Sequence, residues 1–474
     1  MLAPFRGIRY ARDRVSGIAN VTSPPYDVIN GDILDHLRAA DPHNVVRLIL
    51  PGEDADASKA AASLLREWLS AGVLIRDRMA SLYIYEQSVD ADPSCLQRGI
   101  IGLVRLGPPD SAGILPHEGV MPGLVAGRRE LMAATQANLE PIFLIYDGEQ
   151  PGVALHSATG HPATGHCATR HPATGHKATG EGATGVVDWI TAERAPLVSI
   201  TTEDGVTHRM WRIGDSAEQA AISADLAGRR ALIADGHHRY AAYLDLQAES
   251  HAAGLGAGPW DYGLAFLVDS AAYPPRLGAI HRVLPGLPPD RAAELAKAAF
   301  TVQDLPAGLS LDDALPRLAA AGQEGPAFLL AGGPVFRLLS HPDPVQLTAS
   351  MPAGTSAPWQ TLDASVMQQL LLGRLWGVTD SERDVLIDHD ATDAVRAVSG
   401  DPTATDVAER PTGSASASAG AASPGGGTAV ISNPASFEAV AQIAAHGERV
   451  PRKSTSFGPK PRTGLVLRTF GPSD

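Results

Sequence analysis

The 474-residue chain has only two cysteines, Cys95 and Cys167, and no apolar run long enough to cross a bilayer. So few cysteines indicate neither a disulfide framework nor a thiolate zinc site. The N-terminal segment MLAPFRGIRYARDRV has no apolar run of signal-peptide length. We therefore expect a cytoplasmic protein that does not enter a membrane.

Basic residues are also in deficit, because 38 Lys and Arg stand against 52 Asp and Glu, and the formal net charge is −14. A non-specific nucleic-acid binder needs a surplus of Lys and Arg to displace counterions, and so does a protein that binds anionic lipid surfaces. The composition therefore favours a small-molecule substrate over nucleic acid or a membrane. It leaves the oligomeric state open.

The apolar residues make up 44% of the chain, which is enough for a sizeable core. Helical and strand-like patterns alternate along it, as is typical of an α/β fold with mixed strands. Two low-complexity tracts interrupt this pattern. Residues 158–185 repeat units such as ATGHP, and residues 401–428 are rich in Ser, Ala, Gly and Pro. Both are predicted to be flexible insertions, because neither develops an apolar face.

The histidines of the first tract could bind a transition metal weakly, but a tract without a core cannot pre-form a ligand cage. A repeat expansion with no role is therefore the favoured interpretation. These histidines are His161, His166, His171 and His176. The predicted division of the chain is 1–157 as an N-terminal α/β part of the core, 158–185 as an insertion, 186–400 as a further α/β region, 401–428 as a linker, and 429–474 as a C-terminal segment returning to the core.

The sequence RALIADGHHRYAAYL predicts a buried strand over 230–235, a turn at Gly236 and a helix over 237–249. Ligands bind at the carboxyl edge of such strands, and the first turn of a helix carries unpaired N–H groups and a partial positive charge.

His237, His238 and Arg239 fall in that turn, and these donors favour an anion, above all a phosphate. Asp235 could cap the helix, hold Mg²⁺ or accept a hydroxyl proton. The competing interpretation is a capped helix with a polar, exposed end.

The pattern strand-Asp-Gly-x-His-Arg-helix, here Asp235 to Arg239, resembles the phosphate-binding signature of the ParB/sulfiredoxin-like superfamily. That superfamily includes sulfiredoxin, the nucleotide-binding domain of chromosome-partitioning ParB proteins, and free serine kinases. The resemblance implies a ParB/sulfiredoxin-like nucleotide-binding core, and it suggests free L-serine as the acceptor of a phosphoryl group.

A second resemblance extends over almost the whole chain, which is similar to the family called domain of unknown function 1015 (DUF1015). The similar segments are Pro24–Ile29, Asn44–Leu48, Leu115–Glu118, Ala137–Phe143, Ala234–Tyr240, Ile280–Val283 and Lys453–Leu465. They occur in the family's order. The two low-complexity tracts look like additions to the family pattern, and the family name assigns no function.

Leu115-Pro116-His117-Glu118 lies in a segment that Pro116 keeps out of a helix. Since free serine kinases need a carboxylate base near the acceptor hydroxyl, the resemblance makes Glu118 the candidate base. His117 could bind phosphate or orient Glu118. A solvated loop acid is the alternative, and no His-Glu-x-x-His zinc motif is present.

Two further segments are candidates for binding. Tyr26 could stack on a base and Asp27 could bind a substrate amine, although a structural turn explains both residues as well. Lys453, Ser454 and Thr455 offer an ammonium and two hydroxyls for a phosphate, with Lys460 and Arg462 adding charge nearby. The alternative is a solvated basic loop.

Together these features predict transfer of a phosphoryl group from ATP or ADP, with Mg²⁺, to a small hydroxylated metabolite, with free L-serine the best single guess. The main alternative is a nucleotide-binding regulatory switch or slow NTPase without a small-molecule acceptor. A sensor of phosphorylated metabolites is a third possibility. A metal hydrolase using His237 and His238 ranks last, because adjacent helical residues point roughly 100° apart.

Overall fold

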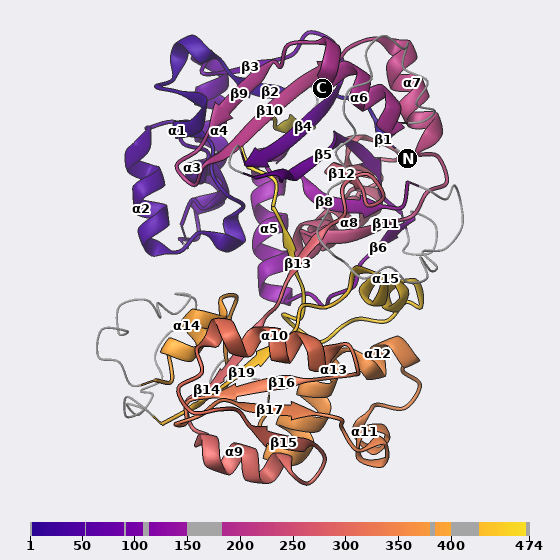
Figure 1. Cartoon of the computed structure of the whole chain (residues 1–474). Helices are drawn as coiled ribbons and strands as arrows, with labels where there is room; N and C mark the ends of the chain where they lie inside the picture. Colours follow the sequence, from indigo (N-terminus) through magenta and orange to yellow (C-terminus); the bar gives the residue numbers. More distant parts are fainter. Residues whose placement is uncertain are drawn as a thin grey trace. The chain divides into compact units, whose positions relative to one another are not determined.

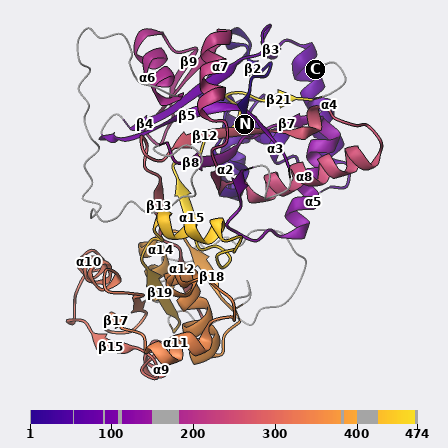
Figure 2. The same cartoon turned by 90° about the vertical axis from the view of Figure 1, so that its right-hand side faces the viewer.

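A computed structural model describes residues 2–52, 54–89, 92–107, 113–148, 183–379, 384–399 and 426–470 (Figures 1 and 2). The chain divides into two compact units. Unit 1 consists of Met1–Pro116, Val120–Pro275 and Pro459–Asp474, and unit 2 of His117–Gly119 and Arg276–Gly458. The stretch 186–400, which the sequence presents as one region, therefore contributes to both units. The C-terminal segment after residue 429 is also shared between them.

Unit 1 is built on a mixed sheet of nine strands in the order β6-β11-β8-β12-β5-β4-β10-β9, with β1 paired to β5. β12 runs parallel to β8, and β11 runs parallel to β6. The strands are β1 (Leu2–Ala3), β4 (Leu82–Val89), β5 (Asp92–Arg105), β6 (Ile114–Leu115), β8 (Ile142–Tyr146), β9 (Val198–Thr201), β10 (Val206–Ile213), β11 (Ala231–Asp235) and β12 (Tyr262–Asp269). This sheet with its helices confirms the predicted α/β class.

Two short strand pairs, β2 (Ile8–Tyr10) with β3 (Leu74–Arg76) and β7 (Ala137–Asn138) with β21 (Arg468–Thr469), complete the strands described in unit 1. The described helices are α1 (Ile18–Val21), α2 (Gly31–Ala40), α3 (Val46–Ile49), α4 (Ala57–Ser70), α5 (Pro122–Thr135), α6 (Ala183–Glu193), α7 (Ser216–Asp225) and α8 (His237–Ala252). Single turns of 3₁₀-helix occupy Arg12–Arg14, Tyr26–Val28 and Pro259–Asp261.

The helix α8 and strand β11 occupy the positions predicted from the sequence, and apolar burial explains both. Every residue of β8 and β11 is buried, as expected for inner strands that are covered on both faces. Helix α5 packs against both α4 and α8 (Figure 2). The inward residues of α8 include Tyr240 and Tyr243, which join the same apolar cluster as β8 and β11. The β11–α8 connection is therefore fixed by a continuous core.

The last unit of the histidine-rich repeat is part of the fold. Helix α6 begins at Ala183, which is fully buried and donates its N–H to Asp225 at 3.0 Å. Thr184 donates its hydroxyl to Asp269 at 2.7 Å. The flexible insertion predicted over 158–185 therefore includes three helical residues, and its remainder, including the four histidines, lies outside the described residues.

Unit 2 contains a six-stranded sheet in the order β15-β17-β16-β19-β14-β18, and its pairings are antiparallel. Its strands are β14 (His281–Leu284), β15 (Thr301–Asp304), β16 (Phe328–Ala331), β17 (Arg337–Ser340), β18 (Leu386–Asp388) and β19 (Thr428–Ser432). A separate pair joins β13 (Arg276–Gly278) to β20 (Ser456–Gly458). Most of the tract 401–428 lies outside the described residues, but Gly426 and Gly427 lead into β19, which starts at Thr428.

The described helices of unit 2 are α9 (Pro289–Ala296), α10 (Leu311–Gly322), α11 (Pro344–Ser350), α12 (Ala357–Thr361), α13 (Asp363–Val366), α14 (Ala391–Arg396) and α15 (Phe437–Ala445). A π-helix, Met367–Trp376, continues directly from α13. Its buried residues, such as Leu370 and Leu371, pack with Phe300 and Phe328 into a core of this unit. In the part of the chain that the structure describes, no helix is both long enough and apolar enough to cross a membrane.

Candidate functional site

The turn between β11 and α8 brings a buried carboxylate to the start of a helix. Gly236 has φ = +94°, a left-handed conformation that glycine adopts without strain. A side chain there would begin 3.1 Å from both Arg239 Nε and Ile142 Cγ2, so space also favours glycine. Helix α8 has no side-chain cap at its N-terminus. Its first N–H groups are therefore not satisfied by a capping side chain, and Asp235 is not the cap that the sequence allowed.

Asp235 instead forms a charged network with two cations. Asp235 is 9% exposed, and its carboxylate pairs with the guanidinium of Arg239 and lies 2.8 Å from Lys460 Nζ. Burial alone would raise the pKa of this carboxyl, but Arg239 and Lys460 outweigh burial and lower it. Asp235 is consequently held in its ionised form although it is almost inaccessible to solvent.

Arg239 is only 2% exposed, and its contacts lie within unit 1. Besides pairing with Asp235, it donates from Nη1 to the carbonyl of Pro141 at 2.7 Å. Burial opposes its charge, but Glu140 and Asp235 outweigh burial and raise its pKa. Its Nε, on the side of Gly236, has no hydrogen-bond partner among the described residues. Arg239 therefore holds Asp235 in place and keeps one buried donor next to the turn.

Tyr26 and Asp27 reach the same network from a distant part of the sequence. The Asp27 carboxylate pairs with Lys460, so one ammonium joins Asp27 and Asp235. The backbone N–H of Tyr26 donates to Glu140 Oε1 at 3.1 Å, and the Arg128 guanidinium lies 4.2 Å from the centre of the Tyr26 ring. Burial raises the pKa of Tyr26 to about 12, so its phenol stays neutral.

The two histidines of the first helical turn differ in their surroundings. His237 is buried, with 8% of its surface exposed, and His238 is half-buried. His238 Nε2 accepts a hydrogen bond from the backbone N–H of Met121 at 3.0 Å. The proton of a neutral His238 therefore lies on Nδ1.

The other predicted residues meet in unit 2. His117 Nε2 lies 2.8 Å from the Thr455 hydroxyl oxygen, and that hydroxyl donates to Glu118 Oε1 at 2.8 Å. Because Thr455 has one hydroxyl proton, His117 is the donor in its own contact with Thr455. Two hydrogen bonds thus run in one direction, from His117 to Thr455 and from Thr455 to the Glu118 carboxylate.

The loop that carries Thr455 has a defined conformation. Lys453 has φ = +51°, which is uncommon for a residue with a side chain. The carbonyls of Arg452 and Lys453 each accept a hydrogen bond from Arg282 Nη2 at 3.0 Å. Ser454 donates its hydroxyl to the Pro451 carbonyl at 2.5 Å. These hydrogen bonds therefore constrain the conformation of the segment that was predicted to bind phosphate.

The predicted residues therefore form two groups. In unit 1 lie Tyr26, Asp27, Asp235, Gly236, His237, His238 and Arg239, and in unit 2 lie His117, Glu118, Lys453, Ser454 and Thr455. The sequence prediction assigned no role to Glu140 and gave Lys460 only as added charge near Lys453, whereas both residues complete the unit 1 network. One signal for Lys460 was available, because Pro459 and Pro461 fix the backbone on both sides of it. Arg462 is instead structural, since it donates to Thr22 and to carbonyls at the end of α1.

Solved structures include several that resemble this chain at low identity. A free serine kinase in complex with AMP is 13% identical, with a TM-score of 0.33, over 76% of this chain and 87% of that one. SbnI from Staphylococcus aureus is 11% identical (TM-score 0.30, 76% and 82% covered), and a conserved hypothetical protein from Pyrococcus furiosus is 12% identical (0.32, 77% and 93%). Likenesses at this level carry no conclusion about ligands or reactions of this chain.

Comparison with protein families gives a match over most of the sequence. The model described as "Protein of unknown function (DUF1015)" matches residues 2–171 and 176–365. These ranges include the β11–α8 turn, the segment His117–Glu118 and Asp27. Among curated proteins, none matches the chain.

Proposed function

The chain belongs to the DUF1015 family, whose name assigns no activity. From the residues of this chain we propose that it is a nucleotide-dependent phosphotransferase acting on a small hydroxylated metabolite. The donor is ATP or ADP with Mg²⁺, and free L-serine is the best single candidate for the acceptor. Free L-serine is proposed as the acceptor because the motif from Asp235 to Arg239 resembles that of free serine kinases.

One observation carries the proposal: an ionised, buried carboxylate lies at a helix N-terminus that no side chain caps. Asp235 is held in its charged form by Arg239 and Lys460, directly before the first turn of α8. A helix N-terminus attracts phosphate oxygens through its N–H groups and its dipole. Lys460 and the buried Nε of Arg239 add donors at the same turn.

The acidic residues of this turn suit Mg²⁺ in a nucleotide complex. Mg²⁺ is usually bound through one or two carboxylates and completes its shell with water and substrate phosphates. Asp27 and Asp235 are two such carboxylates, and they already share the positive charge of Lys460. When bound, Mg²⁺ would neutralise phosphate charge, which is a central requirement of phosphoryl transfer.

Glu118 is the proposed base for the acceptor hydroxyl. It is half-buried and already accepts a hydrogen bond from Thr455, which fixes the orientation of its carboxylate. His117 orients Thr455, and Lys453 supplies a further donor in the constrained loop, where the Ser454 hydroxyl already donates to the Pro451 carbonyl. In this proposal His237 and His238 contribute at the phosphate end through the first turn of α8.

The proposal is tested by incubating the pure protein with ATP or ADP, Mg²⁺ and a pool of hydroxylated amino acids and metabolites. Mass spectrometry should find one new phosphorylated product, with phosphoserine expected, and its formation should require both nucleotide and acceptor. Nucleotide hydrolysis that no acceptor accelerates would instead identify a regulatory switch or slow NTPase. Absence of nucleotide binding would contradict both functions.

A further inference from the structure

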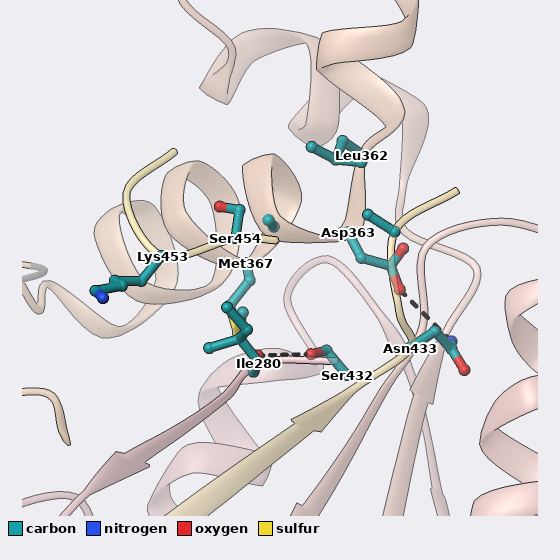
Figure 3. Close-up of a pocket in the computed structure, with 10 residues that line it drawn as sticks. Ile280, Leu362, Asp363, Met367, Ser432, Asn433, Lys453 and Ser454 are labelled. Carbon is teal, nitrogen blue, oxygen red and sulfur yellow. Dashed lines mark hydrogen bonds between the residues drawn. The ribbon is translucent and has the colours of Figure 1, made fainter. Parts of the chain in front are cut away.

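The pocket in unit 2 is too small for a phosphate group. It lies between the start of α13, the end of β19 and the loop that carries Lys453 and Ser454 (Figure 3). Its cavity measures about 10 Å³, which is close to the space that one water molecule needs. Further ligands for a nucleotide are therefore to be sought outside this pocket, and unit 1 offers a cation to which the proposed reaction has assigned no role.

This cation is Arg128, a half-buried residue of α5. Its Nη1 donates to the Ile49 carbonyl at 2.9 Å, and its guanidinium carbon lies 4.2 Å from the centre of the Tyr26 ring. Its Nε and Nη2 donate to no described residue, and it forms no ion pair with a carboxylate of the described ranges. The next residue, Arg129, pairs instead with Glu249 at 2.6 Å. Arg128 therefore keeps two donor nitrogens and an unbalanced positive charge for a ligand.

Arg128 lies close to the β11–α8 turn. The guanidinium carbon of Arg239 is 5.8 Å from the centre of the same Tyr26 ring. The two guanidinium carbons are therefore at most about 10 Å apart, the sum of their distances to that point. Helix α5 packs against α8, and Met121, directly before α5, donates its backbone N–H to His238 in the first turn of α8. One nucleotide can thus contact both the turn and Arg128.

The two arginines differ in what they can still donate. Arg239 pairs with Asp235 through Nη2 and donates from Nη1 to the Pro141 carbonyl, so only its Nε has no partner among the described residues. In Arg128 the nitrogens without such a partner, Nε and Nη2, lie on one edge of the planar group. Two parallel N–H groups on one edge are the arrangement that binds two oxygens of a phosphate. Packing on an aromatic ring also fixes that edge before a ligand arrives.

We propose that Arg128 binds a phosphate group of the nucleotide through Nε and Nη2. The inference rests on the proposed phosphotransferase function, in which the nucleotide phosphates lie at the β11–α8 turn. Its ligand is the diphosphate or triphosphate of a nucleotide, whose remaining phosphate oxygens contact the first turn of α8. A cation without a carboxylate partner suits this role, because phosphoryl transfer depends on neutralising the charge of the phosphates. The carboxylate of an amino-acid acceptor would also fit two parallel donors, so the test has to separate the two anions.

The first test uses wild-type protein, so it does not depend on the folding of a variant. Phenylglyoxal modifies accessible arginines, and mass spectrometry of peptides locates the modified residues. We expect Arg128 to be modified in the free protein and protected by Mg²⁺–ADP. The adjacent Arg129, which is 35% exposed, should be modified equally with and without the nucleotide. Equal modification of Arg128 in both samples would contradict the inference.

The second test compares calorimetric titrations of Mg²⁺–ADP and Mg²⁺–pyrophosphate. Arg128→Ala should weaken the binding of both ligands by about 10–100-fold, the scale for a charged hydrogen-bonding partner. Because pyrophosphate has neither base nor ribose, similar losses for the two ligands would assign the effect to phosphate. Arg128→Lys keeps the charge but not the two parallel donors, so it should restore only part of the affinity. Arg129→Ala is the matched control and should bind like wild type.

The other outcomes distinguish failure of this inference from failure of the proposed function. If Arg128→Ala binds both ligands like wild type and raises only the KM for the acceptor, the residue binds the acceptor carboxylate and the inference is wrong. Equal affinities in wild type and in both alanine variants would likewise overturn the role of Arg128, but they would leave the phosphotransferase proposal intact. If wild type binds neither ADP nor pyrophosphate, the phosphotransferase proposal itself fails.

Discussion

Replacing Glu118 with glutamine should lower turnover by about 10²–10⁴-fold and leave nucleotide affinity almost unchanged. The substitution keeps the size of the side chain and its acceptor for the Thr455 hydroxyl, but it removes the ability to take a proton. Steady-state kinetics of the phosphorylated product and a calorimetric titration with nucleotide measure the two quantities separately. A matched control is Glu438→Gln, an exposed glutamate on α15 of the same unit, which should behave like wild type.

Asp235→Asn should affect a different step from Glu118→Gln, because Asp235 adjoins the turn proposed to bind phosphate and pairs with Lys460. We expect both turnover and Mg²⁺ dependence to change, with partial rescue at high Mg²⁺. Added Mg²⁺ should not rescue Glu118→Gln. Equal rescue of the two variants, or a Glu118→Gln enzyme with full activity, would remove Glu118 from the role of base.

Arg239→Ala should destabilise the protein by about 3–5 kcal/mol, the usual cost of removing one partner of a buried ion pair. Arg239 is 2% exposed, and its loss leaves Asp235, itself 9% exposed, with Lys460 as its remaining cation. It also removes the hydrogen bond to the Pro141 carbonyl. Chemical denaturation followed by circular dichroism would measure the change. Weaker nucleotide binding, by about 1.5–3 kcal/mol, is expected where the variant is still folded.

The pairing can be separated from a general loss of packing with a double-mutant cycle. Arg239→Ala and Asp235→Asn together should cost less than the sum of the single changes, because each single change removes one partner of the same buried ion pair. Arg78→Ala removes an exposed arginine of the same unit and should alter stability by no more than about 0.5 kcal/mol. Strict additivity of the two buried changes would show that the ion pair contributes nothing.

Much of the fold could be predicted from the sequence because the signals were local. The apolar run before Asp235, the glycine and the following helical pattern predicted β11, a turn at Gly236 and α8. The repeat of residues 158–185 predicted an insertion, but its last unit could not be assigned by composition. Ala183 is helical because it fits a core contributed by distant strands, which no local pattern encodes.

The composition of the site was harder to predict, because its contacts join residues far apart in the chain. Lys460 pairs with Asp27, 433 positions away, and no local pattern indicates that one ammonium joins Asp27 to Asp235. Arg239 was predicted to contact phosphate, and its pairing with the Asp235 carboxylate could not be foreseen because it depends on tertiary burial. Charge and spacing predicted a candidate site at this turn, whereas the contacts within the turn depend on tertiary burial.

The central claim, that nucleotide phosphates bind at the β11–α8 turn, is tested most directly by calorimetric titration of Mg²⁺–ADP and Mg²⁺–ATP into wild type and Lys460→Met. Methionine keeps much of the length of the buried stem but removes the ammonium that joins Asp27 and Asp235. Lys59→Met, which changes a lysine with 78% of its side chain exposed on α4, serves as the control. We predict that Lys460→Met weakens binding by about 1.5–3 kcal/mol while Lys59→Met matches wild type. Equal affinity in all three proteins, with Lys460→Met folded, would contradict the claim.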